Sequence, residues 1–203
     1  MKAVSQLDRI HRVYDADPAS YDREMSSGVM RWMLRGRREK VGEEVKGRRV
    51  LDVGFGTGLS LPHYPSSVQV IGVDVSLPML RQAPPESLRV QADAERLPFA
   101  DRSFDSVAFN LCLCTIPDPE RAIREALRVV RPGGRMVFLE HVRSHLLPVA
   151  LVQEALNPAL VLLQADYFNR RTAETARRAG VEIVSVDRWF LGIFNLIVGK
   201  APS

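Results

Sequence analysis

The chain is poor in the residues that build disulfide frameworks and metal centres. Its 203 residues include two cysteines, Cys112 and Cys114, and four histidines. On a strand, the one-residue spacing would place both thiols on the same face, where they cannot join distant segments. A Cys-x-Cys pair without further cysteines is also a poor zinc site, so we expect reduced, buried thiols and no bound metal.

Long uninterrupted apolar runs are also missing. The most apolar stretch, residues 146–163, has five interruptions: Pro148, Gln153, Glu154, Asn157 and Pro158. No charge-free run therefore reaches the ~20 residues that a transmembrane helix needs. The N-terminus has no apolar segment of the signal-peptide kind. These absences predict a cytoplasmic protein, with contact to a membrane surface as an open alternative.

The overall composition is that of an ordinary globular chain. Hydrophobic residues make up 46% and charged residues 26% of the sequence, whose length predicts one domain. The net charge is +4, which favours anionic partners in general. Because the arginines are spread along the chain, the charge by itself specifies neither lipid nor nucleic acid.

The densest group of glycines directly follows a β-branched apolar run. Residues 49–60 read RVLDVGFGTGLS, with glycine at positions 54, 56 and 58. This order predicts a buried strand that turns sharply into a helix, with glycines that let the main chain approach a ligand. A dinucleotide fingerprint needs glycine at the sixth position, where this chain has Leu59. The loop therefore favours a nucleotide-like ligand other than NAD.

Residues 1–47 carry helical periodicity and are expected to form an N-terminal cap. The first helix face runs from Val4 to Val13, and a second helix is predicted over residues 25–45. Between them lie the doublets Tyr14-Asp15 and Tyr21-Asp22. The second helix carries four arginines: Arg31, Arg35, Arg37 and Arg38. They form either a solvated face or an interfacial face against anionic lipid headgroups.

From residue 49 onward, strand and helix patterns alternate, which predicts a mostly parallel sheet with helices on both faces. Further strands are expected over residues 68–75, 88–92, 106–113 and 135–142. Ser76 and Asp118 are N-cap candidates, and Asn169 or Thr172 caps a helix that stops at Gly180. Residues 146–166 are expected to form a lid or pocket wall. Residues 181–190 and 194–200 should pair as an antiparallel hairpin.

The glycine loop and the acids that end the next strands resemble class I S-adenosylmethionine (SAM) methyltransferases over residues 49–142. The resemblance implies an α/β, Rossmann-like, doubly wound, seven-stranded and mostly parallel sheet with an antiparallel last strand. It divides the chain into a helical cap (1–47), a cofactor-binding core (48–142) and a lid with a C-terminal helix and hairpin (143–203). SAM would be the methyl donor and S-adenosylhomocysteine (SAH) the product.

The residues that the resemblance assigns to SAM binding also suit the chemical groups of SAM. Asp52 would attract the cationic groups of SAM, and Asp74 would accept hydrogen bonds from the ribose hydroxyls. Asp93 would accept from the adenine amine, and Met79 with Leu97 would sandwich the ring. The expected cofactor set is Asp52, Gly54, Phe55, Gly56, Thr57, Gly58, Asp74, Val75, Met79, Asp93, Ala94, Glu95, Asn110 and Leu111.

Methyl transfer is an in-line displacement that mainly needs positioned, desolvated reactants. A general base is required only where the acceptor carries a proton. His141, at the end of a strand, is the candidate base, although a hydrogen-bonded position in the pocket wall is the competing interpretation. Tyr14 and Tyr21 are further catalytic candidates, and Tyr167 is expected to shape the acceptor pocket.

Three resemblances compete for the acceptor. Residues 56–64 and 109–121 resemble bacterial phosphatidylethanolamine N-methyltransferases, which is the favoured assignment. Residues 139–144, 172–180 and 197–201 resemble thiol-methylating proteins, and the core is shared with ubiquinone/menaquinone C-methyltransferases. All three imply an amphiphilic acceptor, with peripheral contact to an anionic membrane and a monomer or homodimer.

Two other function classes compete with methylation of an amphiphilic small molecule. One is a SAM-binding module without catalysis, which the loop, the two strand-end acids and the lid disfavour. The other is a nucleic-acid methyltransferase. After the fourth strand the chain reads Asn110-Leu111-Cys112-Leu113 instead of the Asn/Asp-Pro-Pro-Tyr/Phe element of amino-methylating nucleic-acid enzymes, so no nucleic-acid partner is expected.

Overall fold

A computed structural model describes residues 5–203, so Val4 of the first expected helix lies outside the described residues. Seven strands form one sheet in the order β3-β2-β1-β4-β5-β7-β6. Their bounds are β1 Arg49–Val53, β2 Gln69–Asp74, β3 Leu88–Gln91, β4 Phe104–Asn110, β5 Val130–His141, β6 Glu182–Trp189 and β7 Phe194–Lys200. The neighbours from β3 to β5 pair in parallel, and β7 runs antiparallel to both β5 and β6. The predicted fold class, with its antiparallel last strand, is confirmed.

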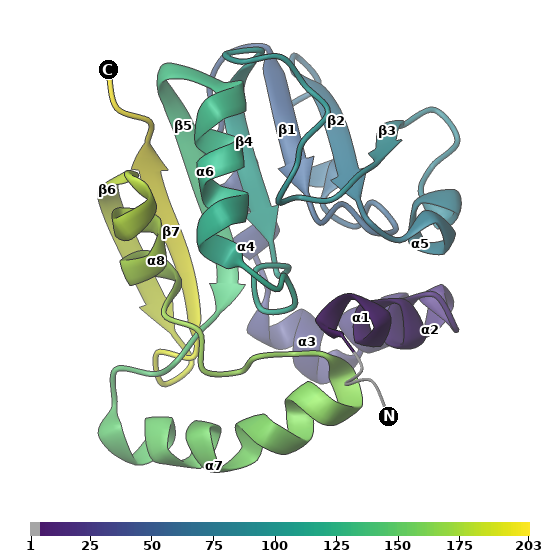
Figure 1. Cartoon of the computed structure of the whole chain (residues 1–203), viewed down its shortest axis with the longest axis vertical. Coiled ribbons are helices and arrows are strands. Elements are labelled where there is room, and N and C mark those ends of the chain that lie inside the picture. Colours follow the sequence, from purple (N-terminus) through teal and green to yellow (C-terminus); the bar gives the residue numbers. More distant parts are fainter. Residues whose placement is uncertain (1–4) are drawn as a thin grey trace.

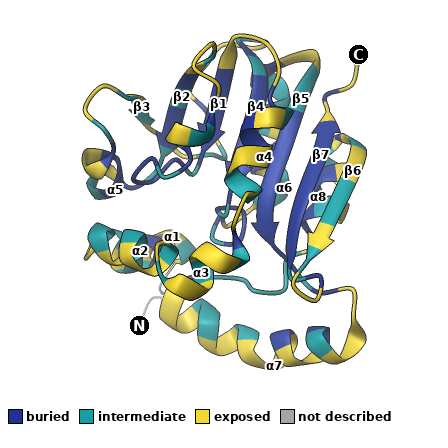
Figure 2. Cartoon of the chain, turned by 180° about the vertical axis from the view of Figure 1, so that it is seen from behind, coloured by how far each residue is buried: buried dark blue, intermediate teal, exposed yellow. Residues whose placement is uncertain are grey.

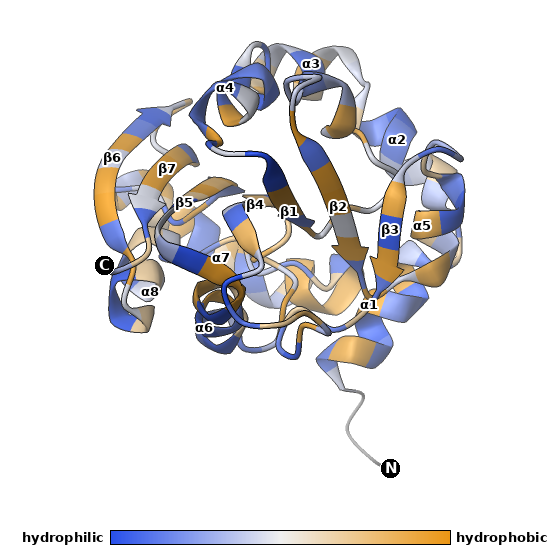
Figure 3. Ribbon diagram, turned by 90° about the horizontal axis from the view of Figure 1, so that it is seen from above, coloured by the Kyte–Doolittle hydropathy of each residue, from blue (hydrophilic) through white to orange (hydrophobic). Residues whose placement is uncertain are grey.

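Helices cover both faces of the sheet and one of its edges (Figure 1). They are α1 Gln6–Tyr14, α2 Pro18–Met25, α3 Gly28–Met33, α4 Arg37–Glu44, α5 Leu77–Gln82, α6 Pro119–Val129, α7 Leu147–Gln164 and α8 Thr172–Ala179. Seen from above, α6 and α8 lie on one face and α4 on the other (Figure 3). Helices α1–α3 and α7 lie beyond the carboxyl ends of the parallel strands (Figure 1). In doubly wound sheets this is the edge where ligands bind.

The core lies between the sheet and its helices because the central strands are apolar on both faces. Phe104, Phe109 and Phe138 are fully buried on the side of α6, where Ile123 packs against them. On the other side Val41 of α4 packs in a second cluster with residues of β1, β5 and β7. This packing fixes the carboxyl ends of β1, β4 and β5 relative to one another.

The single helix expected over residues 25–45 is wrong, because the structure has three short helices, α2, α3 and α4, in and around this range. Ser26 ends α2, and the Ser27 side chain caps α3 at once. Gly36 has φ +70°, a left-handed conformation that helps to end α3 and to start α4 in a new direction. Tyr21 consequently lies inside α2 and not between two helices.

Three further expectations are corrected. The glycine loop leads into a short 3₁₀ turn, Leu61–His63, because prolines 62 and 65 limit helix growth. Strand β4 ends at Asn110, since Leu111 has φ +55°, so both cysteines lie in the following turn and not on a strand. Helix α8 begins at Thr172 after Arg171, which makes no side-chain cap bond, and ends at Gly180 as expected.

Helix α7 lies across the end of the molecule with most of its length uncovered (Figure 2). Its buried residues are Ala150 and Gln153. Among the described residues it is the one helix that matches a membrane span by length and composition, and 17% of it is buried. Six of its large apolar residues are exposed: Leu147, Leu151, Val152, Leu156, Leu162 and Leu163. The lid expected over residues 146–166 is therefore a helix with a wide apolar surface.

Candidate functional site

The glycine loop is a tight turn between β1 and β2 in which main-chain atoms take the place of side chains. Gly54, Gly56 and Gly58 all have positive φ. A Cβ on Gly54 would lie 2.2 Å from the Cβ of Cys112, so no larger residue fits there. The Phe55 ring lies against Gly72 of β2, where a Cβ would lie 2.2 Å from its Cγ. The glycine loop therefore packs closely against β2 and against the turn after β4.

Asp74, at the end of β2, holds this loop through its carboxylate. Its Oδ2 accepts from the Gly56 amide at 2.9 Å, and its Oδ1 accepts from the Ser76 amide at 2.9 Å. Burial raises the pKa of Asp74, although the amide hydrogen bonds of Ser76 and Gly56 lower it. The carboxylate stands beside the loop, and each oxygen keeps a second lone pair for a ligand.

Asp52 and Asn110 lie beneath the loop, fully or almost fully buried. Asn110 donates from Nδ2 to Asp52 Oδ1 at 2.8 Å and to the Tyr64 hydroxyl at 3.2 Å. Burial raises the pKa of Asp52 to about 7, against hydrogen bonds from Asn110 and Tyr64 that lower it. Neither residue lines the clefts described below, so the structure places them as supports under the loop.

Two small clefts run along the glycine loop. The first, about 60 Å³, is bounded by Gly54, Gly56, Asp74 and Met79. The second, about 50 Å³, lies toward β3 and is lined by residues that include Val75, Asp93 and Ala94. Helix α1 covers both clefts with Ile10. Most of the expected cofactor residues therefore meet along one continuous groove.

Two residues of the expected adenine end lie elsewhere. Glu95 accepts from the Asp118 amide at 2.8 Å, which places its carboxylate at the start of α6. Leu97 is buried in the core cluster that contains Phe104. The apolar cover near Asp93 comes instead from Leu7 and Ile10 of α1.

A larger cavity of about 500 Å³ adjoins the loop end of this groove. Tyr14, Tyr21 and Leu111 line both the cavity and the first cleft. The two tyrosine rings meet edge to face with centroids 6.1 Å apart. The rest of the wall is mostly apolar, with contributions from α2, α3, the segment after α7 and the turn before β7: Met25, Met30, Met33, Phe168, Phe190, Ile193 and Phe194. Two connected compartments thus share one boundary.

The two Tyr-Asp doublets hold the cap onto the groove. Thr57 Oγ1 of the glycine loop donates to Asp22 Oδ1 at 2.5 Å, and Ser76 Oγ donates to Asp15 Oδ1 at 2.5 Å. Thr57 therefore faces the cap. In each doublet the tyrosine lines the large cavity and the first cleft. The aspartates accept from Thr57 of the glycine loop and from Ser76 of the groove.

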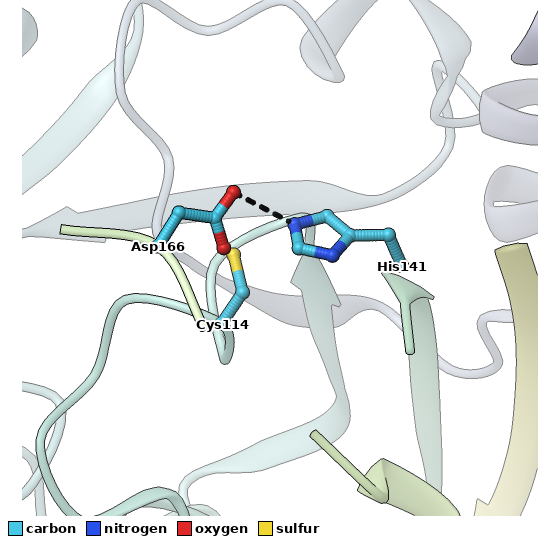
Figure 4. A group of neighbouring side chains, drawn as sticks. All are labelled: Cys114, His141 and Asp166. Carbon is cyan, nitrogen blue, oxygen red and sulfur yellow. Dashed lines mark ion pairs between the residues drawn. The ribbon is translucent and has the colours of Figure 1, made fainter. Parts of the chain in front are cut away.

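Among the polar residues that line the large cavity, His141, Asp166 and Cys114 lie close together. Their side chains are shown in Figure 4. His141 Nε2 and Asp166 Oδ2 are 3.1 Å apart. His141 ends β5, Cys114 lies in the turn after β4, and Asp166 follows α7. The Phe168 ring packs at 4.7 Å from the imidazole. Tyr167 does not line the cavity; its amide donates to the Cys114 carbonyl and its ring packs under Arg170.

Burial acts in opposite directions on the pKa values of His141 and Cys114. It disfavours charge on His141, but the hydrogen bond to Asp166 and the nearby carboxylates outweigh this and raise the pKa of His141. Burial, Asp166 and Glu140 raise the pKa of the Cys114 thiol well above its usual value. Both cysteines are free and buried, as predicted.

Glu140 fixes the turn that carries these groups. It is fully buried, and its Oε1 accepts from the amides of Cys112 at 3.0 Å and Leu113 at 3.1 Å. Burial raises its pKa to about 7, against the Leu113 amide, His141 and the Cys112 amide. The carboxylate thereby holds Leu111 at the boundary between cleft and cavity.

Several of these residues escape sequence reasoning. Asp15 and Asp22 are visible as members of the doublets, but their partners lie 61 and 35 residues away. Asp166 has no local motif and reaches His141 only because α7 ends in a left-handed residue, Ala165, with φ +57°. Buried Glu140, directly before His141 at a strand end, is the one signal that the sequence offered for the support of the turn.

Comparisons with known proteins agree with this architecture. Residues 51–138 match the family model described as a methyltransferase domain. The chain is 41% identical to a phosphatidylethanolamine N-methyltransferase of Cereibacter sphaeroides over 59% of its own length and 64% of the relative's. It is 34% identical to a ubiquinone/menaquinone biosynthesis C-methyltransferase of Vibrio campbellii, over 74% of its own length and 64% of the relative's. The matched region thus spans just under two thirds of both relatives.

A solved structure extends the likeness to the fold of the whole chain. It is a phosphoethanolamine N-methyltransferase of Haemonchus contortus in complex with phosphomonomethylethanolamine and SAH. The match has a TM-score of 0.72 and 19% identity, and it covers 100% of this chain and 61% of the other. From the family match, the two relatives and the shared fold, we conclude that residues 51–138 form a methyltransferase domain and that the chain has the fold of SAM-dependent methyltransferases.

Proposed function

We propose that this protein transfers the methyl group of SAM to the amino headgroup of phosphatidylethanolamine. The observation that carries the proposal is the junction at Tyr14, Tyr21 and Leu111, which border both the groove along the glycine loop and a large apolar cavity. The methyl group has to move from the cofactor groove to the acceptor cavity across this junction, because the donor sulfur, the methyl carbon and the acceptor atom must lie in line. Support for an amine acceptor comes from the relative named for this activity.

The groove suits SAM by the chemistry of its walls. Asp74 would accept hydrogen bonds from the ribose hydroxyls, Asp93 and the Ala94 amide would meet the adenine edge, and Met79 would cover the ring. Gly54 and Gly56 offer main-chain atoms to the amino-acid tail of the cofactor. Asp52 and Asn110 act from below, as supports of the loop, and Phe55 keeps it seated on β2. Bound in this way, SAM supplies an activated methyl group to the acceptor compartment.

The acceptor cavity suits an ammonium attached to an apolar body. Met30, Met33 and Phe190 offer apolar contacts, and the aromatic Tyr14 and Tyr21 rings offer faces that attract a cation. With His141 unprotonated, the His141–Asp166 pair carries one negative charge, which would attract the headgroup ammonium. An ammonium must lose a proton before it can attack, and we assign this proton to the same pair.

The outer surface beside the cavity suits delivery from a membrane. Gln164 and Phe190 line the cavity and are also exposed, so it opens beside α7. Trp32 of α3 and Phe190 are also exposed, and their ring centroids lie 5.9 Å apart. Helix α3 lies at the same end of the sheet as α7 (Figure 1). Arg31 and Arg35 stand exposed near Trp32, where anionic headgroups would meet them. The α7 surface, defined as α7 with Trp32 and Phe190, is our proposed membrane-contact face.

A two-stage experiment tests this proposal. Calorimetry should show SAH binding, weakened about 10–100-fold in Asp74→Asn, which can no longer accept from both amides and a ligand. Radiolabelled methyl transfer from SAM is then measured with phosphatidylethanolamine vesicles, a small alkyl thiol and a quinone precursor. Label in phosphatidylethanolamine alone is expected.

The two stages fail in different ways. A wild-type protein that binds neither SAM nor SAH would overturn the methyl-donor assignment. Binding together with label in the thiol or quinone would keep methyl transfer and replace the acceptor; the C-methyltransferase relative makes the quinone the second candidate. Binding without label in any acceptor would indicate a SAM-binding module. His141→Asn should bind SAH normally but transfer label about 10²-fold more slowly or worse.

A further inference from the structure

We propose that Cys114, His141 and Asp166 form a binding site for a zinc-type divalent metal ion in the wall of the acceptor cavity. Each residue offers one ligand atom, and these atoms all lie within 4.8 Å of one another. Figure 4 shows the three side chains converging from separate segments of the chain. The sequence hid this group, because the cysteine that takes part has its partners 27 and 52 positions further along the chain.

The donor set has the chemistry of a zinc site. A thiolate, an imidazole and a carboxylate are the three ligand types that zinc prefers. Thiolate and carboxylate together balance the charge of a divalent ion, so the occupied site is neutral inside a buried pocket. Tetrahedral zinc holds its nitrogen and oxygen ligands about 3.3 Å apart. The His141 Nε2 to Asp166 Oδ2 separation is already 3.1 Å.

The backbone around the ligands is held in place by hydrogen bonds from other parts of the chain. The Tyr167 amide donates to the Cys114 carbonyl at 3.0 Å, which ties the two ligand segments together. Gln6 of α1 donates from Nε2 to the carbonyls of Ala165 at 2.6 Å and Thr115 at 3.2 Å. These carbonyls adjoin Asp166 and Cys114 in the chain. The convergence is therefore supported from two sides.

An unused hydrogen-bonding atom in the group points to a ligand. Within residues 5–203, buried Asp166 Oδ1 has no hydrogen-bond partner. A buried carboxylate oxygen left unpaired is costly. A metal ion that draws the thiolate and the carboxylate together would satisfy the free carboxylate lone pairs.

The fourth coordination position would face the cavity of about 500 Å³. Three protein ligands with an open position are the arrangement of zinc sites that bind a further molecule. One consequence rests on the proposed function: the ion replaces the proton shared by His141 and Asp166, and a metal-bound amine has no lone pair for attack. The occupied site therefore blocks amine methylation, and removal of the ion restores it.

Cobalt(II) titration of tag-free, chelator-treated protein tests the site directly. We expect one ion per chain, intense visible bands of tetrahedral cobalt and a near-ultraviolet sulfur-to-cobalt charge-transfer band, all displaced by Zn²⁺. Cys114→Ser should lose the charge-transfer band, whereas the matched control Cys112→Ser should keep it. His141→Gln and Asp166→Asn should each weaken binding at least about 10–100-fold.

Two results would overturn the site. One is a wild type that shows no saturable cobalt spectrum while its circular dichroism shows a folded chain. The other is a charge-transfer band that survives in Cys114→Ser. SAH binding by chelator-treated wild type is measured in parallel, so a failed metal site and a failed methyltransferase assignment give different results. Zn²⁺ should reduce methyl transfer to the amine, and chelator should reverse the loss.

Discussion

At the scale of single residues, the most consequential groups are buried acids that support the turns around the ligands. Asp52 and Glu140 are fully buried, and burial raises the pKa of each to about 7. One lies under the glycine loop and the other under the turn after β4. Glu140 accepts from two main-chain amides and Asp52 accepts from the Asn110 side chain, and a hydrophobic residue could make neither contact.

Replacing Asp52 by asparagine should change how stability depends on pH. The folded protein holds the Asp52 proton up to about pH 7, whereas the unfolded chain releases it near 3.8. Stability from this group is therefore present at low pH and falls as pH rises between these values, by about 4 kcal/mol at most. Asp52→Asn keeps the acceptor for Asn110 and removes this fall. Urea unfolding at several pH values measures it.

A matched control separates this effect from a general loss of stability. Burial raises the pKa of Asp105, but the Arg49 and Arg48 amides and Arg131 outweigh it, so its net pKa is lowered. Asp105→Asn should shift stability by a constant amount above about pH 5, because the lowered pKa of Asp105 places its own titration below that pH. Because Glu140 titrates there too, the slope in Asp52→Asn should shrink and not vanish. An unchanged slope in Asp52→Asn would contradict the prediction.

Gly72→Ala should disturb the cofactor loop from its far side. An added Cβ would lie 2.2 Å from Phe55 Cγ and within 2.6 Å of two further ring atoms. The ring has to move, which we expect to cost about 1–3 kcal/mol of stability and to weaken SAH binding. Thermal unfolding and calorimetry measure the two effects. Gly28→Ala is the control, because a Cβ there meets nothing within 4 Å and Gly28, like Gly72, does not have positive φ; equal SAH affinity in all three proteins would refute the role of Phe55.

At the scale of elements, the strands were predictable and the helical cap was not. A buried parallel strand needs a β-branched, apolar run, and that signal is local, as in β2 and β4. The signals that end helices at Ser26 and Gly36 are local too. The helical period of apolar residues continues across both positions, so the sequence pattern predicts one helix where the structure has three. Glu95 and Leu97 lie away from the cofactor groove, because Glu95 bonds to the start of α6 and Leu97 packs in the core.

The candidate site divides in the same way. Gly54, Asp74 and Asp93 follow strands at recognisable positions, so sequence order alone groups them. Asp166 and Cys114 meet His141 only through the paths of α7 and of the turn after β4. Contacts between segments so far apart depend on packing that the sequence pattern does not encode.

Helix α7 should govern membrane binding. Leu151 and Leu162 are 54% and 66% exposed, so the double change Leu151→Glu/Leu162→Glu leaves the core intact. We expect at least about tenfold weaker co-sedimentation with anionic liposomes, because two apolar contacts are lost and two like charges are added. Val184→Glu is the control, since Val184 of β6 is 59% exposed but lies outside the α7 surface. Equal loss in both variants would exclude α7 as the contact face.

At the scale of the whole molecule, the cap and the sheet edge enclose the groove together. Leu7 and Ile10 of α1 lie over the cofactor clefts, which measure about 60 and 50 Å³ in this state. A cofactor as large as SAM therefore needs the cap to move before it can enter or leave. Two side-chain hydrogen bonds hold the cap in place: Ser76 donates to Asp15, and Thr57 donates to Asp22.

Weakening the hydrogen bonds of Asp15 and Asp22 should speed the release and binding of the cofactor. In Asp15→Asn/Asp22→Asn the charge that strengthens each 2.5 Å hydrogen bond is lost, and we expect SAH to dissociate about tenfold faster. Hydrogen exchange over residues 6–25 should rise in the SAH complex, because opening of the cap exposes these amides. Arg23→Gln is the control on the same helix, since it breaks an exposed ion pair with Asp17 that contributes little. Stopped-flow dissociation that is equally slow in all three proteins, with unchanged exchange over α1 and α2, would show that the cap is held by its apolar contacts alone.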